Sequence, residues 1–160
     1  SQSSWVFLTE ELERLKLYLK LEFMRFAKFQ YEIEVDAGID TNEVKIPPMI
    51  LQPYVENSIW HGILPLEKEG NILISVQLIK EGKYLRFVVE DDGIGIEASL
   101  MKKKAFPAEH DSKGMKITET RIDLLRRMTD GEIKINGPYD IKNEGKGTGT
   151  RVEIILPIKI

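Results

Sequence analysis

Residues 88–96 place an acidic side chain and two glycines directly after an apolar stretch. Side chains alternate along a strand, so Asp91 shares the side of Phe87 and Val89 and is expected to face the core. A buried carboxylate needs hydrogen-bond donors, and the exocyclic amino group of a purine is a suitable one. The segment therefore favours a nucleotide site. Asp-Gly also favours a hairpin turn, but residues 97–104 predict a helix and not a returning strand.

A second polar group lies on the helix predicted from Pro47-Pro48 to about Gly62. Asn57 and His61 lie on one side of that helix, with Tyr54 nearby and an aliphatic stripe on the opposite side. An asparagine carbonyl is the kind of oxygen ligand that magnesium uses. A polar helix face is equally typical of simple exposure to solvent.

Two further segments carry glycines. Residues 112–115 are expected at the start of a helix, where free N–H groups form an anion site, although a plain helix start explains them as well. Residues 145–150 predict a flexible loop before the last strand, with Thr150 beside the strand of Asp91. The chain has no GxxxxGK[ST] motif and no GxGxxG after a strand, which disfavours the two common nucleotide-binding folds.

The elements that must position these groups are helices and strands in irregular order. An apolar stripe from Leu8 to Phe26 predicts a first helix, with Thr9 as its N-cap. Further predictions are a strand at 31–35, a hairpin that turns at Glu81-Gly82, a mobile connection at 102–113, a helix after Gly114, and strands at 132–136 and 151–156. This pattern predicts a two-layer α/β (α+β) sandwich, in which helices pack on one face of a mixed, mostly antiparallel sheet.

Composition narrows the class of protein. With 160 residues and 42% hydrophobic content, the chain is long enough for one core. A net charge of −3 disfavours nucleic acid as a partner, and the absence of cysteine excludes disulfides and thiolate metal sites. The chain has no apolar run long enough to span a bilayer and no signal-peptide pattern, and we expect it to be a cytoplasmic piece of a longer protein.

The order of the motifs resembles the ATP-binding domain (Bergerat-type fold) of the histidine kinase, gyrase, Hsp90 and MutL superfamily. Residues 51–62, LQPYVENSIWHG, are similar to the N box of LytS-type sensor histidine kinases. Residues 12–26 fit the helix that leads into this domain in those kinases. The resemblance implies a lead-in helix in residues 1–30 and an ATP-binding catalytic domain in residues 31–160.

The resemblance also implies roles for individual residues. Asn57 matches the asparagine that coordinates magnesium, and His61 matches a neighbouring residue that faces the nucleotide. Asp91 matches the aspartate that accepts a hydrogen bond from the adenine amino group. Gly93 and Gly95 match the glycines that let the chain pass close to the base.

Further matches concern the ATP lid and the adenine network. Residues 102–113 match the lid, and Lys113, Gly114 and Met115 match its phosphate-side hinge. Thr150 matches the hydroxyl that joins the aspartate network.

Four features depart from the family pattern. Trp60 stands where many relatives carry a lysine, and Ser112 replaces the first glycine of the lid hinge. Pro53 stands one turn before Asn57, where ATP-hydrolysing relatives carry a carboxylate. The helical hairpin that carries the phosphoacceptor histidine is missing. His61 falls in the nucleotide site and His110 in the lid, so neither is a good candidate acceptor.

The resemblance implies a catalytic domain of a two-component sensor histidine kinase that donates the γ-phosphoryl group of ATP, with magnesium, to a histidine outside this chain. The implied partners are its own dimerisation and phosphoacceptor domain and a response regulator. The parent is expected as a homodimer anchored in the inner membrane, and this chain alone as a monomer. Two alternatives are an ATPase of the gyrase or Hsp90 kind, which Pro53 disfavours, and a non-catalytic regulator, which the intact Asn57 and Asp91 disfavour.

Overall fold

The computed structural model describes residues 5–105, 110–143 and 146–159. For residues 103–105, 110–118, 142–143 and 146–148 only the backbone is described. The elements, in chain order, are β1 (Val6–Phe7), α1 (Leu8–Phe26), β2 (Phe29–Val35), β3 (Lys45–Ile46), α2 (Gln52–Asn57), the π-helix η1 (Ser58–Ile63), β4 (Gly70–Ile79), β5 (Tyr84–Asp91), α3 (Ile96–Ala105), α4 (His110–Met128), β6 (Lys134–Asn143) and β7 (Lys146–Pro157).

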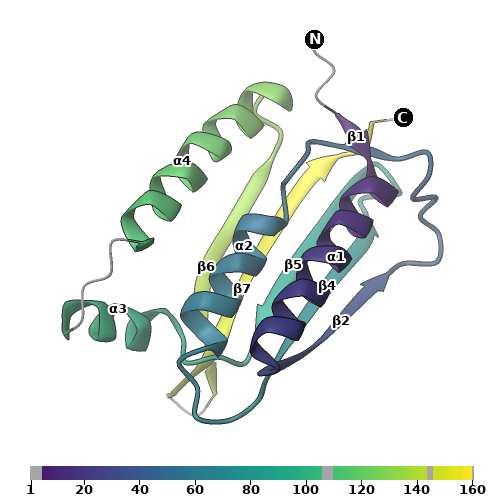
Figure 1. Ribbon diagram of the computed structural model, residues 1–160. Helices are drawn as coiled ribbons and strands as arrows, with labels where there is room; N and C mark the ends of the chain where they lie inside the picture. Colours follow the sequence, from purple (N-terminus) through teal and green to yellow (C-terminus); the bar gives the residue numbers. More distant parts are fainter. Residues whose placement is uncertain (1–4, 106–109, 144–145, 160) are drawn as a thin grey trace.

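A five-stranded sheet in the order β2-β4-β5-β7-β6 forms one layer of the molecule. Strand β2 pairs with β4 in parallel, and the other three pairings are antiparallel. Figure 1 shows α1 and α2 against one face of this sheet, with α3 and α4 near its β6 side. The predicted two-layer architecture with a mixed, mostly antiparallel sheet is therefore confirmed.

Helix α1 covers the sheet with an unbroken leucine stripe. Leu8, Leu12, Leu15 and Leu19 are all buried in the core. The helix ends at Ala27, which adopts a left-handed φ of 48° and donates its amide hydrogen to Phe23. In the described part of the chain, no helix is both long and apolar enough to cross a bilayer.

The predicted N-cap of α1 is wrong, because the helix already begins at Leu8. Its first amide groups donate to backbone carbonyls of a neighbouring loop, Leu8 to Val44 at 2.8 Å and Thr9 to Thr41 at 2.9 Å. Tertiary contacts thus satisfy the groups that a capping side chain would otherwise satisfy. The Thr9 hydroxyl instead contacts the side chains of Thr41 and Asn42.

The second predicted helix begins later than expected. Residues Lys45–Ile46 form β3, and Met49 has a left-handed φ of 58°, which a helix cannot contain. Pro53 occupies the first turn of α2, so this proline marks the helix start in place of Pro47 and Pro48. The helix then continues as the π-helix η1, a rare conformation that is frequent at functional sites.

The predicted connection at 102–113 is wrong over most of its length. Helix α3 continues to Ala105 and α4 begins at His110, which leaves only residues 106–109 outside the described part. Gly114 consequently lies within α4 and not before it. Lysine and alanine are good helix formers, and this preference prevails over a lysine-rich composition that is typical of loops.

The last two strands are longer than predicted. Strand β6 covers Lys134–Asn143 and β7 covers Lys146–Pro157, so most of the expected glycine-rich loop belongs to a strand. The glycines permit close contact with β5: a Cβ atom on Gly149 would lie 1.8 Å from the Asp91 carbonyl oxygen. Only residues 144–145 of that loop lie outside the described part.

A buried carboxylate fixes the segment between β3 and α2. Glu11 of α1 is 2% exposed, and its Oε1 accepts a hydrogen bond of 3.0 Å from the Met49 amide. On the other side, the Arg121 guanidinium of α4 donates to the Pro48 carbonyl. Side chains from two helices thus hold the strained backbone at Met49, directly before α2.

We expect Glu11→Ala to lower the free energy of unfolding by about 1–3 kcal/mol, because it leaves the Met49 amide without its acceptor. Glu13→Ala is the matched control, since Glu13 lies on the same helix and is exposed. Urea unfolding of both variants measures the difference. Equal losses in the two variants would contradict a stabilising role for the Glu11 contact.

Candidate functional site

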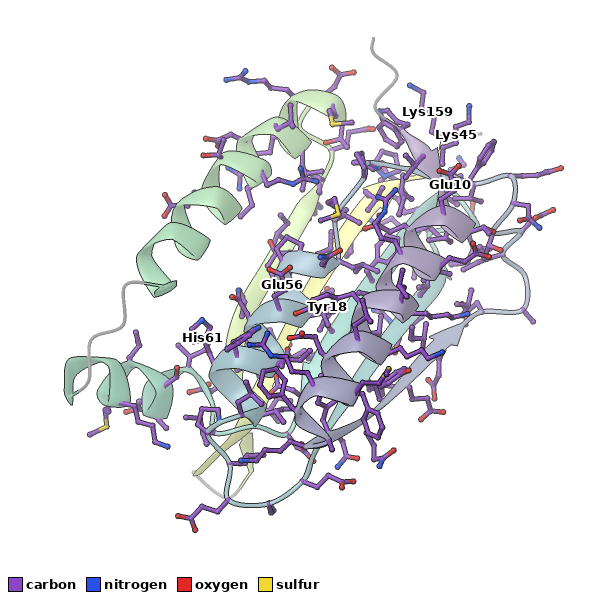
Figure 2. The ribbon with its side chains drawn as sticks, in the orientation of Figure 1. Glu10, Tyr18, Lys45, Glu56, His61 and Lys159 are labelled. Atoms are coloured by element: carbon purple, nitrogen blue, oxygen red, sulfur yellow. The ribbon has the colours of Figure 1, made fainter. Side chains whose placement is uncertain are left out.

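A cavity of about 350 Å³ lies between α2, α3, α4 and the sheet. It brings together four of the predicted site residues, namely Asn57, His61, Gly95 and Thr150. Figure 2 shows His61 on the side of its helix that faces α3 and α4. The cavity also contains residues that the sequence did not single out, including Ile96, Ser99, Leu100, Glu119, Ile122, Gly137 and Pro138.

Asp91 ends β5 and is 4% exposed. Its carboxylate accepts hydrogen bonds from the Thr150 and Ser58 hydroxyls, which both line the cavity, and one of 2.9 Å from the Gly93 amide. Burial raises the pKa of Asp91 above its ordinary value, and these donors oppose the rise. The predicted pairing of Asp91 with Thr150 is direct, because the two residues are opposite each other in β5 and β7.

Two glycines allow η1 to pack against the turn after β5. A Cβ atom on Gly93 would lie 2.3 Å from the Gly62 carbonyl carbon, and one on Gly62 would lie 2.9 Å from Asp91 Oδ1. The Ile94 amide also donates to the Gly62 carbonyl at 2.9 Å. Gly93 is therefore required by the packing of the protein itself, apart from any contact with a ligand.

The raised pKa of Asp91 makes stability depend on pH in a defined direction. Between its unfolded and folded pKa values, the folded protein keeps the proton that the unfolded chain has lost. The ionised carboxylate therefore destabilises the folded state increasingly as the pH rises through this window. Asp91→Asn removes the destabilisation by the ionised carboxylate. The free energy of unfolding of the variant should therefore rise relative to that of the wild type above about pH 4, the ordinary range of aspartate.

Urea unfolding of the wild type and Asp91→Asn at a series of pH values measures this difference. Asp36→Asn is a suitable control, since the Asp36 carboxylate accepts from the Leu78 amide at an exposed position. A difference between wild type and Asp91→Asn that is flat or falls with rising pH would contradict the expected effect.

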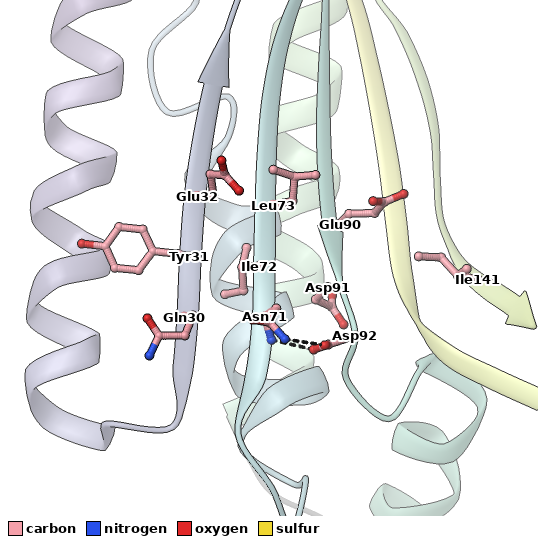
Figure 3. Close-up of a pocket in the computed structure, with 10 residues that line it drawn as sticks. All are labelled: Gln30, Tyr31, Glu32, Asn71, Ile72, Leu73, Glu90, Asp91, Asp92 and Ile141. Atoms are coloured by element: carbon pink, nitrogen blue, oxygen red, sulfur yellow. Dashed lines mark hydrogen bonds between the residues drawn. The ribbon is translucent and has the colours of Figure 1, made fainter.

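Two aspartates that the sequence did not single out hold the loops around the cavity. Asp92 accepts from the Asn71 amide at 2.6 Å and from its side chain at 2.8 Å, as Figure 3 shows. Asp140 of β6 accepts from the Ile96 and Glu97 amides at the start of α3. Asp140 lies more than forty residues after Ile96 and Glu97 in sequence, so no local signal reveals its contact.

A second cavity of about 410 Å³ lies on the side of the sheet away from α2 (Figure 3). Asp91 also lines this cavity. Three of its acidic residues already have partners: Asp91 binds Thr150, Asp92 binds Asn71, and Glu90 forms an ion pair of 2.7 Å with Arg151. This cavity therefore lacks a set of unengaged carboxylates that would bind a cation.

The opposite side of α2 and η1 packs against α1. The Trp60 ring makes an edge contact with Phe26, with centroids 5.3 Å apart, and the Arg25 guanidinium lies 5.5 Å from the Trp60 centroid. Glu56 accepts from Gln52 at 3.1 Å and lies near Tyr18 of α1 in Figure 2. The tryptophan that departs from the family pattern thus joins the N-box helix to α1.

The predicted anion site changes with the start of α4. Lys113, Gly114 and Met115 lie in the first turns of a helix that begins at His110, and their side chains are outside the described part of the structure. The free N–H groups of a helix belong to its first four residues, which places them at residues 110–113. Gly114 lies beyond them, where its amide is directed to the preceding turn.

The donor set of the cavity suits a magnesium ion that arrives with a ligand. Among the described residues, no group of three or more histidine, aspartate or glutamate side chains could hold a metal ion by itself. Asn57 lines the cavity, and an asparagine amide oxygen is a hard donor. Magnesium usually keeps several waters and takes its other ligands from phosphates, which agrees with a single protein oxygen.

A protein-family model described as "Histidine kinase-, DNA gyrase B-, and HSP90-like ATPase" matches residues 42–160. The chain belongs to this family. This membership confirms the superfamily inferred from the order of the motifs, and it agrees with a buried aspartate beside a cavity in the fold described above.

Curated sensor proteins and solved histidine kinase structures are similar to most of the chain. Sensor protein LytS of Oceanobacillus iheyensis is 30% identical over 99% of this chain, which spans 26% of that protein. The catalytic domain of histidine kinase ThkA has the same fold, with a TM-score of 0.61, 15% identity, and coverage of 98% of this chain and 96% of that one. ThkA in complex with the response regulator protein TrrA gives a TM-score of 0.55 and 18% identity over 96% of this chain and 41% of that one.

Proposed function

We propose that this chain is the ATP-binding catalytic domain of a sensor histidine kinase. The observation that carries the proposal is the buried Asp91 carboxylate, which bonds two hydroxyls of the cavity wall in a chain of this ATPase family. An adenine amino group is a donor that such a carboxylate accepts, and apolar walls suit a planar base.

Asn57 and His61 line the same cavity and are proposed to face the phosphates. Asn57 would hold a magnesium ion through its amide oxygen, and the ion would neutralise phosphate charge. Lys113, Gly114 and Met115 are proposed to close over the phosphates from the start of α4. Gly95, which has a left-handed φ of 89°, is proposed to lie close to the base together with Gly93.

The proposed reaction transfers the γ-phosphoryl group of ATP to an imidazole nitrogen of a histidine on a segment outside this chain. The bond between the γ-phosphorus and the bridging oxygen breaks, a phosphorus–nitrogen bond forms, and ADP leaves. The protein would act mainly by positioning and by charge neutralisation. Pro53 stands one turn before Asn57 and has no group that could activate water, which favours transfer over hydrolysis.

The partners and the location are proposed from the relatives. The chain spans about a quarter of the LytS protein that it resembles, so the dimerisation and phosphoacceptor domain is proposed to lie in the rest of a longer parent. A response regulator is proposed to receive the phosphoryl group from that histidine, since ThkA is seen in complex with one. We propose that the domain is cytoplasmic, that its parent is a membrane-anchored homodimer, and that this chain alone is a monomer.

Calorimetric titration with a non-hydrolysable ATP analogue, with and without magnesium, tests the proposed site. We expect magnesium-dependent binding that Asn57→Ala weakens by about tenfold or more, since the variant removes the amide oxygen from the cavity wall. Gln30→Ala is the control, because Gln30 is an exposed amide side chain at the second cavity. A folded wild type that does not bind the analogue at millimolar concentration would refute the proposed function.

We also expect no acid-labile phosphoryl label on this chain after incubation with labelled ATP and magnesium. The reason is that His61 lines the proposed nucleotide cavity and is not placed as an acceptor. Pro53 cannot activate water, which bears on hydrolysis. Phosphate release should likewise stay near the uncatalysed rate. Label on His61 or His110 would contradict the assignment of the acceptor to another segment, and rapid phosphate release would favour an ATPase.

A further inference from the structure

The Tyr54 hydroxyl is an unusual group in this cavity. Among the side chains that the structure describes, it is the one buried polar atom without a hydrogen-bond partner. Tyr54 is 5% exposed and lines the cavity together with Asn57, His61 and Thr150. A buried hydroxyl with no partner is costly, so a phenylalanine would suit the position better if the ring served only the core.

The chemistry of this hydroxyl fits a ligand contact. Burial raises the pKa of Tyr54, so its phenol stays neutral and can donate one hydrogen bond and accept another. The residue lies one turn before Ser58, the hydroxyl of which bonds Asp91. Tyr54 therefore lies on the same side of the helix as Ser58, the side that faces Asp91.

The surroundings distinguish between the two ends of a nucleotide. The cavity that Tyr54 lines includes the aliphatic side chains of Val89 and Val152 from the sheet and Ile122 from α4. Phosphates need nearby positive charge or a metal ion, which these side chains do not supply. A purine ring suits such walls, and its ring nitrogens are hydrogen-bond acceptors.

We propose that the Tyr54 hydroxyl donates a hydrogen bond to the base of the bound nucleotide, directly or through one water, and so adds a recognition residue to Asp91. The inference rests on the proposed nucleotide-binding function. A ligand in the cavity would then supply the hydrogen-bond partner that the described part of the protein does not provide.

Tyr54→Phe tests the proposal, because it removes only the hydroxyl. We expect about tenfold weaker binding of ADP, with a similar ratio for adenosine, and an unchanged or higher melting temperature without nucleotide. Tyr18→Phe is the matched control: Tyr18 belongs to α1 and donates to Glu22 at 3.4 Å, so its removal should leave the affinity unchanged. Calorimetry measures ADP, and NMR titration measures the weaker adenosine.

The outcomes separate this inference from the proposed function. Binding of ADP by the wild type with equal affinity in Tyr54→Phe would overturn the role of Tyr54 alone. A loss of affinity for ADP without a loss for adenosine would place the contact at the phosphates, and would also overturn the role of Tyr54 at the base. A lower melting temperature together with unchanged affinity would show a structural hydroxyl. No binding by the folded wild type would overturn both.

Discussion

The burial of one carboxylate at the end of a core strand is the constraint on which the site depends. Asp91 is 4% exposed, so the folded protein must surround it with donors, and it does so from three separate segments. Ser58 comes from η1, Thr150 from β7 and the Gly93 amide from the turn after β5. Each segment has to approach Asp91 closely, which explains why Gly62, Gly93 and Gly149 lie around it. The price of this arrangement is an aspartate whose pKa is raised, and a ligand that donates a hydrogen bond would offset it.

A set of polar contacts outside the cavity keeps its walls in place. Asp92 ties the end of β5 to β4, and Asp140 ties β6 to the start of α3. Glu11 and Arg121 hold the strained segment before α2 from two sides. These contacts join elements that are distant in sequence, and none of them points into the cavity. They are therefore positioning contacts, and the groups that would meet a ligand are left to α2, η1 and the strands.

The composition of the cavity favours binding and positioning over acid–base chemistry. Its wall combines the Asn57 amide and the Tyr54 phenol with aliphatic side chains, and also includes His61 and Glu119. The buried Asp91 carboxylate bonds the Ser58 and Thr150 hydroxyls of this wall. Glu56 adjoins Asn57 in sequence but accepts a hydrogen bond from Gln52 and lies near Tyr18 of α1. Pro53 provides no group at the position where a hydrolase would need one. This composition agrees with the proposed function, in which the domain would present a nucleotide to an acceptor on another segment.

The sequence by itself indicated most of the helices and strands, though not β1, β3 or η1, and the core stripe of α1. It also indicated Asn57, His61, Asp91 and Thr150 as candidate site residues, because alternation and helical spacing are local properties. It also supported the family, since the motifs follow one another in a specific order. Tertiary structure decided the start of α2 and the strand at the glycine-rich segment. It also decided the contacts of Asp92 and Asp140. These features depend on partners far away in the chain, and a residue's local preference carries no information about a distant group that satisfies its hydrogen bonds or limits its space.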